Sequence, residues 1–169
     1  GFHLGEKEKW AKRSLWKNST KVPLIISGPG IPKGETCDLP VQLLDICPTL
    51  LGLSGLASAP IHQVNALIPI LKKGASEWPY VARTSIGPGN YSIVSKNYRF
   101  IQYNDGTEEF YDRLNDPNEW YSLINDQALK GVIEEHRNKI PNQRHKILGE
   151  GSLGHESYIF SEKGVLDPN

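Results

Sequence analysis

The residues best suited to chemistry lie within the first twelve positions of the chain. They are a histidine and three lysines in a polar, tryptophan-bearing stretch: His3, Lys7, Lys9 and Lys12. A lysine ammonium group is a flexible point charge, which suits it to stabilise negative charge on a transferring group and its oxygens. On composition alone, a solvated lysine-rich loop explains the stretch equally well.

The bulk composition narrows the class of protein. The 169 residues carry 19 basic and 19 acidic side chains, so the chain lacks the excess of positive charge that is typical of nucleic-acid-binding proteins. No apolar run approaches the length of a membrane span. Methionine is absent, even at position 1, so we expect an internal or C-terminal piece of a longer protein. The two cysteines do not indicate whether the protein works in an oxidising or a reducing compartment, and neither has metal-ligand spacing to a histidine.

The segment after the lysines predicts a buried strand. Residues 22–26 form a short apolar run that ends before a Gly-Pro-Gly turn, a pattern typical of a strand buried on both faces. No neighbouring strands are evident, so we expect residues 22–27 to pair with strands from outside the chain. The loop 1–12 should then reach the carboxyl edge of that sheet, where α/β folds place their ligands.

Helical patterns follow. Residues 41–53 have apolar positions at helical spacing, with Asp45 as the expected N-cap, Pro48 in the first turn and Gly55 as the stop. Residues 66–73 predict a short helix or turn.

The sequence pattern of the second half of the chain predicts an antiparallel sheet. Strand candidates, separated by hairpin-type turns, cover residues 80–86, 91–95, 98–103 and 109–112. An amphipathic helix is predicted over residues 128–140, with Leu129, Val132 and Ile133 shielded against the sheet. Residues 142–169 lack periodicity and are expected to form an extended tail.

Three stretches, in this order, resemble the formylglycine-dependent sulfatases. The opening Leu-Gly-Glu-x-x-x-Trp-x-Lys at residues 4–12 leads into Val-Pro-Leu-Ile at 22–25, residues 40–51 read Pro-Val-Gln-Leu-Leu-Asp-Ile-Cys-Pro-Thr-Leu-Leu, and residues 109–119 read Glu-Phe-Tyr-Asp-Arg-Leu-Asn-Asp-Pro-Asn-Glu. The resemblance runs from Gly1 to about Pro141. It is nearest to the iduronate-2-sulfatase-like and bacterial polysaccharide sulfatase group.

The resemblance implies an α/β, alkaline-phosphatase-like fold. In that fold a large mixed sheet flanked by helices carries the active site, and a small C-terminal antiparallel sheet with one helix packs beside it. Residues 1–75 would belong to the catalytic α/β domain, residues 76–141 would form the sheet and helix subdomain, and residues 142–169 would be the tail.

The same resemblance implies sulfate-ester hydrolysis, with a sulfated small molecule or glycan as substrate. Lys12 matches the family lysine that contacts the substrate sulfate. Lys7 and Lys9 lie where some relatives place a histidine that touches the substrate, and His3 lies close to the expected metal. Lys7, Lys9 and His3 are therefore further candidates for substrate binding beside Lys12. The divalent metal, expected to be Ca²⁺, would be held by residues upstream of Gly1, with no metal ligand within this chain. The remainder of the sulfatase chain is therefore an expected partner.

The formylglycine nucleophile, made from Cys or Ser, is also expected upstream. Cys47 is not a candidate for it, because a proline follows directly and no arginine follows, so we assign Cys47 to the core. This chain alone is then expected to be inactive. The resemblance further implies a periplasmic, secreted or lysosomal location.

Two alternatives remain open at this stage. A phosphodiesterase or phosphonate hydrolase of the same superfamily would share the fold and use a Thr or Ser nucleophile. A non-catalytic carbohydrate-binding module would use aromatic side chains as stacking platforms; the candidates are Trp78, Tyr80, Tyr91, Tyr98 and Tyr103.

Overall fold

A computed structural model describes residues 1–57, 65–73 and 78–142. The tail predicted over 142–169 lies outside the described residues, except for its first residue. In the part of the chain that is described, no helix combines the length and the apolar character that crossing a membrane requires. The division of the chain at positions 75 and 141 stays a prediction.

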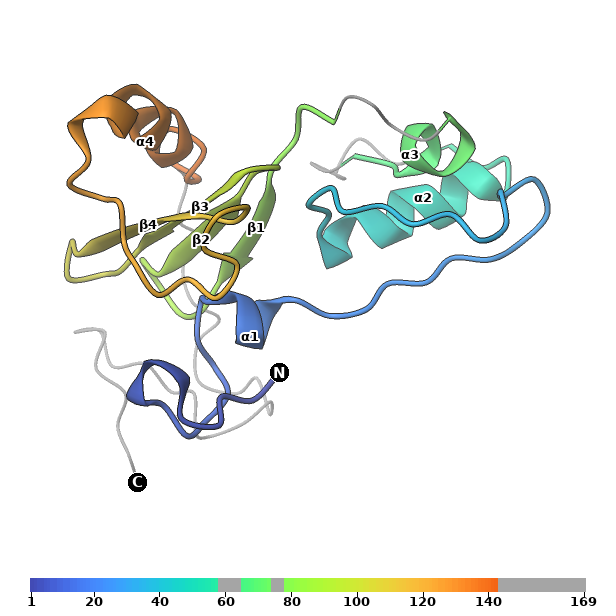
Figure 1. The fold of residues 1–169 in the computed structure, drawn as a ribbon. Coiled ribbons are helices and arrows are strands. Elements are labelled where there is room, and N and C mark those ends of the chain that lie inside the picture. The colour runs from blue at the N-terminus through green and yellow to red at the C-terminus, as the bar shows by residue number, and fades with distance from the viewer. Residues whose placement is uncertain (58–64, 74–77, 143–169) are drawn as a thin grey trace, which may run out of the picture.

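A four-stranded antiparallel sheet forms the centre of the structure (Figure 1). The strands follow one another in sequence order; they are β1 (Ala82–Ser85), β2 (Tyr91–Val94), β3 (Tyr98–Gln102) and β4 (Glu108–Asp112). The turn between β3 and β4 uses Gly106 at φ +86°, a backbone conformation that favours glycine. The predicted meander is confirmed.

One face of the sheet packs against the helix α4 (Lys130–Arg137). Ile93, Phe100 and Phe110 lie opposite one another on three adjacent strands, and all three are fully buried. Ile133 of α4 completes this cluster, with Leu129 and Val132 packed around it. The predicted helix and its apolar face are confirmed, although α4 begins two residues later and ends three residues earlier than the predicted range 128–140.

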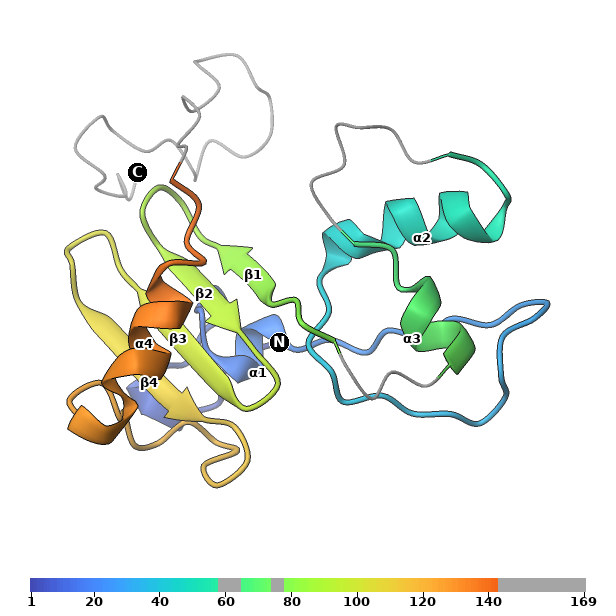
Figure 2. The same ribbon diagram turned by 90° about the horizontal axis from the view of Figure 1, so that it is seen from above.

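The opposite face of the sheet packs against the first twenty residues (Figures 1 and 2). This segment contains a 3-10 turn over Glu6–Glu8 and the short helix α1 (Lys17–Thr20). Leu15 inserts beside Ile101 of β3 and Tyr111 of β4 in a second buried cluster. The first twenty residues and strands β3 and β4, which are far apart in the sequence, therefore pack directly against each other.

A pair of helices, α2 (Ile46–Leu53) and α3 (Ile68–Lys73), lies to one side of the sheet (Figure 2). Thr49 joins them, because its hydroxyl accepts the backbone N–H of Leu67 at 2.8 Å. The backbone of Gly52 approaches Ile68 so closely that an added Cβ would lie 2.4 Å from Ile68 Cδ1. The predicted helices over residues 41–53 and 66–73 are thus confirmed in type, with a 3-10 turn (Leu43–Asp45) before α2.

Residues 22–27, the predicted buried strand, are extended without a strand partner within the described part of the chain, and Ile25 is 88 % exposed. A strand needs the edge of a neighbour, and among the described residues the sheet pairs only its own four strands. The partners of residues 22–27 were expected from outside this chain, so the buried strand stays a prediction. The position of the loop 1–12 at the edge of that outside sheet also stays a prediction; within this chain the first twenty residues pack on the four-stranded sheet.

Two details of α2 differ from the prediction. Asp45 lies at the predicted N-cap position, but its carboxylate does not accept an N–H group of α2; it accepts the backbone N–H of Gln42 at 3.1 Å, within the preceding 3-10 turn. Cys47 is exposed rather than in the core. The reason is that α2 turns Pro48 and Thr49 inward, which leaves the preceding position on the outer side of the helix.

Candidate functional site

Residues 3–14, which we call the lysine loop, close on themselves like a hairpin. The His3 N–H donates to the Ala11 carbonyl at 2.9 Å, and the Gly5 N–H donates to the Lys9 carbonyl at 3.1 Å. Gly5 has φ +115°, and a Cβ there would meet the Trp10 ring at 3.2 Å. Position 5 therefore favours glycine, because the Trp10 ring packs against its backbone and leaves little room for a side chain.

His3 lies beneath the lysine loop and is 1 % exposed. Its Nε2 is 2.8 Å from the Ser14 hydroxyl, which in turn donates to the Ser19 hydroxyl at 2.8 Å. The Nδ1 atom is buried and has no hydrogen-bond partner among the described residues. The edge of the Trp16 ring system packs against the imidazole, with ring centroids 5.7 Å apart. In this conformation His3 has no access to solvent.

Lys12 directly follows the residue that closes the loop, and its side chain is exposed. Within the described part of the chain, Lys12 has no hydrogen bond or ion pair. Its backbone neighbours are fixed on both sides, by the Ala11 carbonyl and the Ser14 hydroxyl. Among the described residues, Lys12 is therefore an unpaired, exposed lysine on a backbone segment that hydrogen bonds hold on both sides.

Lys7, by contrast, points toward the sheet. Its Nζ donates to the Tyr111 hydroxyl at 2.8 Å and lies over the Tyr111 and Trp16 rings, 4.4 and 5.0 Å from their centroids. Burial lowers the pKa of Lys7, while Glu109 acts to raise it. Lys9 is half-buried at the other side of the turn. Of the four predicted site residues, His3 and Lys7 thus hold the loop, and Lys12 faces outward.

A buried ion pair fixes the chain that follows the lysine loop. Arg99 of β3 is 3 % exposed, and its Nε lies 2.5 Å from Glu119 Oε1. The Arg99 Nη1 also donates to the Leu15 carbonyl at 2.9 Å and to the Ser92 hydroxyl at 2.8 Å. The other Glu119 oxygen accepts the Lys17 N–H at 2.8 Å. The pair therefore ties two backbone groups of the first twenty residues to the sheet.

Glu109 of β4 is a second anchor. One of its oxygens accepts from Trp16 Nε1 at 2.6 Å and from the Tyr111 hydroxyl at 2.7 Å, and the other accepts from the Tyr103 hydroxyl at 3.2 Å. Burial, reinforced by this carboxylate, raises the pKa of both tyrosines well above the usual value for a phenol. Because the Tyr111 hydroxyl also accepts from Lys7 Nζ, the hydrogen bonds of Glu109 extend through Tyr111 to the lysine loop.

Sequence reasoning missed these anchoring residues, although two signals pointed to them. Arg99 is the single charged residue of strand β3 and is followed by the apolar Phe100 and Ile101; a charge in such a strand is expected to be paired. Glu109 and Glu119 both lie in the third stretch that carries the family resemblance.

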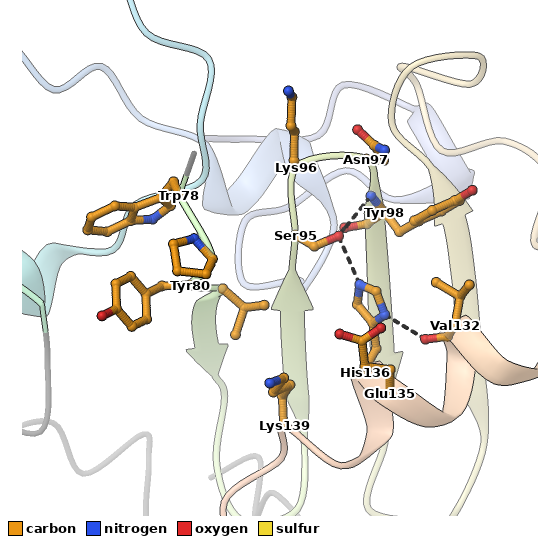
Figure 3. Close-up of a pocket in the computed structure, with 12 residues that line it drawn as sticks. Trp78, Tyr80, Ser95, Lys96, Asn97, Tyr98, Val132, Glu135, His136 and Lys139 are labelled. Carbon is orange, nitrogen blue, oxygen red and sulfur yellow. Dashed lines mark hydrogen bonds between the residues drawn. The ribbon is translucent and has the colours of Figure 1, made fainter. Parts of the chain in front are cut away.

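A separate cavity of about 240 Å³ lies between α4, the turn after β2, and the segment that enters β1 (Figure 3). Within its wall, His136 bonds the Val132 carbonyl at 2.7 Å and the Ser95 hydroxyl at 2.9 Å. Trp78 and Tyr80 contact each other edge-on at its rim. None of the four predicted site residues lines this cavity.

The aromatic residues proposed as a carbohydrate platform do not share one surface. Tyr98 stacks on Phe110 in the core, and Tyr103 bonds Glu109 on the opposite face of the sheet. Only Trp78, Tyr80 and Tyr98 border the cavity. The five residues therefore do not form one continuous stacking platform.

Ca²⁺ requires several oxygen ligands around one point. Among the described residues, no group of three or more His, Cys, Asp or Glu side chains is placed to hold a metal ion. The unpartnered atom of His3 is a nitrogen, which does not suit a hard cation. The described residues of this chain do not fit Ca²⁺ by themselves.

Comparison with known proteins now gives the family. Residues 5–146 match the family described as N-sulphoglucosamine sulphohydrolase, C-terminal. The chain belongs to this family of sulfatase C-terminal regions. The matched range includes most of the lysine loop, the four-stranded sheet and α4.

Individual sulfatases are similar to this sulfatase C-terminal region over most of its length. A sulfatase of Formosa agariphila is 39 % identical over 163 residues, which are 96 % of this chain and 32 % of that protein. A Delta 4,5-hexuronate-2-O-sulfatase of Bacteroides thetaiotaomicron is 33 % identical, over 73 % of this chain and 28 % of that protein. The chain thus spans about a third or less of the length of these curated relatives.

Solved structures agree on the fold. A 2-O GAG sulfatase superimposes with a TM-score of 0.67 at 26 % identity, over 82 % of this chain and 33 % of that chain. A second structure, in complex with D-glucosamine-2-N,6-O-disulfate, has a TM-score of 0.68 at 24 % identity, over 86 % of this chain and 34 % of that chain. The alkaline-phosphatase-like class is confirmed, and the described residues supply its small antiparallel sheet with helix.

Proposed function

We propose that the complete protein hydrolyses sulfate esters of a sulfated carbohydrate, and that this chain supplies a cationic contact to the substrate sulfate. The family match supports the reaction class. Relatives that bear the names Delta 4,5-hexuronate-2-O-sulfatase and N-acetylglucosamine-6-O-sulfatase support a sugar substrate. The single structural observation that carries the proposal is Lys12, which is exposed and unpaired among the described residues and is held on both sides.

The proposed role of Lys12 follows from its charge and placement. Its ammonium group would bind the sulfate and stabilise the negative charge that builds on the sulfate oxygens during cleavage. Lys9, half-buried in the same loop, would give a weaker second contact. Lys7 and His3 would act by holding the loop, because both side chains are bonded within the protein.

The rest of the active site would come from parts of the protein outside this chain. We expect these parts to bring a formylglycine nucleophile and the ligands of a divalent metal. Residues 22–27 would then pair with strands of the catalytic domain, which would cover the exposed Val22 and Ile25. The periplasmic, secreted or lysosomal location belongs to the same proposal.

A comparison of the complete protein with this chain tests the function. Both are assayed with 4-nitrophenyl sulfate, a sulfated disaccharide and, as the rival substrate, a 4-nitrophenyl phosphodiester. We expect the complete protein to cleave the sulfates in preference to the phosphodiester, and the chain alone to show no turnover. Preference for the phosphodiester would overturn the proposed reaction. Turnover by the chain alone that disappears in Cys47→Ala would overturn the rejection of Cys47.

A further inference from the structure

We infer that His3 is a positioning residue for Lys12. This inference rests on the function proposed above, in which the Lys12 ammonium binds the substrate sulfate. His3 bonds the chain on both sides of Lys12, through its backbone N–H to the Ala11 carbonyl at 2.9 Å and through its side chain to the Ser14 hydroxyl at 2.8 Å. The two bonds together form a clamp around Lys12 and Arg13.

The backbone inside the clamp needs such support. Arg13 has φ +69°, a left-handed conformation that is unfavourable for a residue with a long side chain. Residues in such conformations persist only where their surroundings fix them, and they gather at functional sites. Arg13 lies between Lys12 and Ser14, so the His3–Ser14 bond restrains the turn that aims Lys12.

The hydrogen-bond direction shows which atom of His3 supports the loop. Ser14 donates its hydroxyl proton to Ser19, so the Ser14 oxygen accepts from His3 Nε2. The support that the His3 side chain gives therefore needs an N–H donor at the position of Nε2.

His3 itself does not reach a substrate in this conformation. It is 1 % exposed, with the Trp16 ring against it. Any effect of His3 on turnover must therefore pass through the loop that it holds. His3 is therefore not expected to bind the substrate directly. The effects of substitutions at His3 and Lys12 on kcat/KM should then not be independent.

The test uses the complete protein and steady-state kinetics with 4-nitrophenyl sulfate. His3→Leu keeps a buried side chain of similar size and removes the donor, whereas His3→Gln keeps an N–H donor near the position of Nε2. We expect His3→Leu to lower kcat/KM roughly tenfold, because small displacements of a catalytic group are costly. His3→Gln should recover most of the loss. Loss in both variants alike, or in neither, would overturn the clamp.

A double-mutant cycle separates positioning from general destabilisation. In a Lys12→Ala background, His3→Leu should change kcat/KM by less than about twofold, because the group that it positions is gone. A further tenfold loss in that background would show that His3 acts elsewhere and would contradict the inference.

Hydrogen exchange keeps the inference testable if the proposed function fails. Should the complete protein leave sulfate esters intact, or should Lys12→Ala alone have no effect, the proposed function or the role of Lys12 is wrong. The clamp is then judged by the amide exchange of residues 11–14. Faster exchange in His3→Leu than in His3→Gln would support it, and equal exchange would refute it.

Discussion

The two faces of the four-stranded sheet are built on different principles. The face toward α4 is apolar, with Ile93, Phe100 and Phe110 buried against Ile133. The face toward the first twenty residues combines a small apolar cluster with buried or half-buried charges, which bond residues 93 to 104 positions apart in the sequence. Apolar packing holds layers together without strong direction, whereas hydrogen bonds and ion pairs fix orientation.

This difference assigns separate tasks to the two faces. The α4 face joins residues up to 40 positions apart, Ile93 and Ile133, and it stabilises the packing of α4 on the sheet. The opposite face fixes where the lysine loop lies, because Arg99, Glu119 and Glu109 bond the backbone and side chains that flank it. A buried polar network of this kind is stable only when it is complete. Substitutions on the α4 face should therefore change stability alone, whereas substitutions on the opposite face should change both stability and activity.

The largest effect on stability is expected at the buried ion pair. Arg99→Met leaves the Glu119 carboxylate buried without its guanidinium partner, so the free energy of unfolding should fall by about 3–5 kcal/mol. Urea denaturation measures this loss. The matched control is Arg137→Met on the α4 side, where the partly exposed pair with Glu108 should contribute about 1 kcal/mol or less. Equal losses at the two sites would erase the proposed difference between the faces.

The largest effect on activity is expected at Lys12. In the complete protein, Lys12→Ala should lower kcat/KM roughly a hundred- to thousandfold, about 2.7–4 kcal/mol, since it removes a group that stabilises charge. Thermal stability should be unchanged, because the side chain is exposed. Lys130→Ala, at an exposed position on α4, is the control and should leave kcat/KM intact. A loss below about threefold for Lys12→Ala would make this lysine a bystander.

The sequence predicted the α4 face well. Its strands, turns and helix follow from local patterning, because alternation, hairpin residues and helical spacing are all read within a few positions. The features that local patterning does not settle depend on distant partners. Residues 22–27 have the composition of a buried strand, but no edge within the described residues pairs with them, so this strand stays a prediction. Cys47 was misplaced because the buried side of α2 is decided by its contact with α3.

The site was predictable only in part. Lys12 was singled out by its spacing from Gly5 and Trp10, and its role stays a prediction. Lys7 carries the same charge in the same loop, yet it points to Tyr111, which is 104 positions away. No local pattern reveals which lysine turns inward, because that choice depends on a hydrogen-bond acceptor and two aromatic rings from elsewhere.

A smaller effect is expected on the α4 face. Ile93→Val removes one methylene from a fully buried position, so the free energy of unfolding should fall by about 0.5–1.5 kcal/mol. The kcat/KM of the complete protein should not change, because this face has no bond to the lysine loop among the described residues. Ile25→Val makes the same change at a position that is 88 % exposed in this chain, and should leave the unfolding free energy of the chain unaltered. An activity loss in Ile93→Val would mean that the two faces are coupled.

The smallest effect concerns the pH dependence of the loop face. The pKa values of Tyr103 and Tyr111 are raised by burial and by Glu109, above the value near 10 expected in the unfolded chain. Their contribution to stability is therefore complete below about pH 10 and is lost as the pH rises through the folded pKa values. Lys7 acts in the opposite sense, because burial lowers its pKa and its unfavourable contribution disappears as the pH rises toward the unfolded value.

Two tyrosines outweigh one partly buried lysine, so the melting temperature should decline above about pH 10. Tyr103→Phe keeps the ring and removes one of the two phenols, which should make the decline shallower. Tyr121→Phe removes a phenol that is 76 % exposed and should leave the slope unchanged. Thermal melts between about pH 8 and 11 give the three slopes. Identical slopes for the wild type and both variants would show that the loop face does not raise the pKa of Tyr103. The two faces of the sheet would then not differ in their electrostatic contribution to stability.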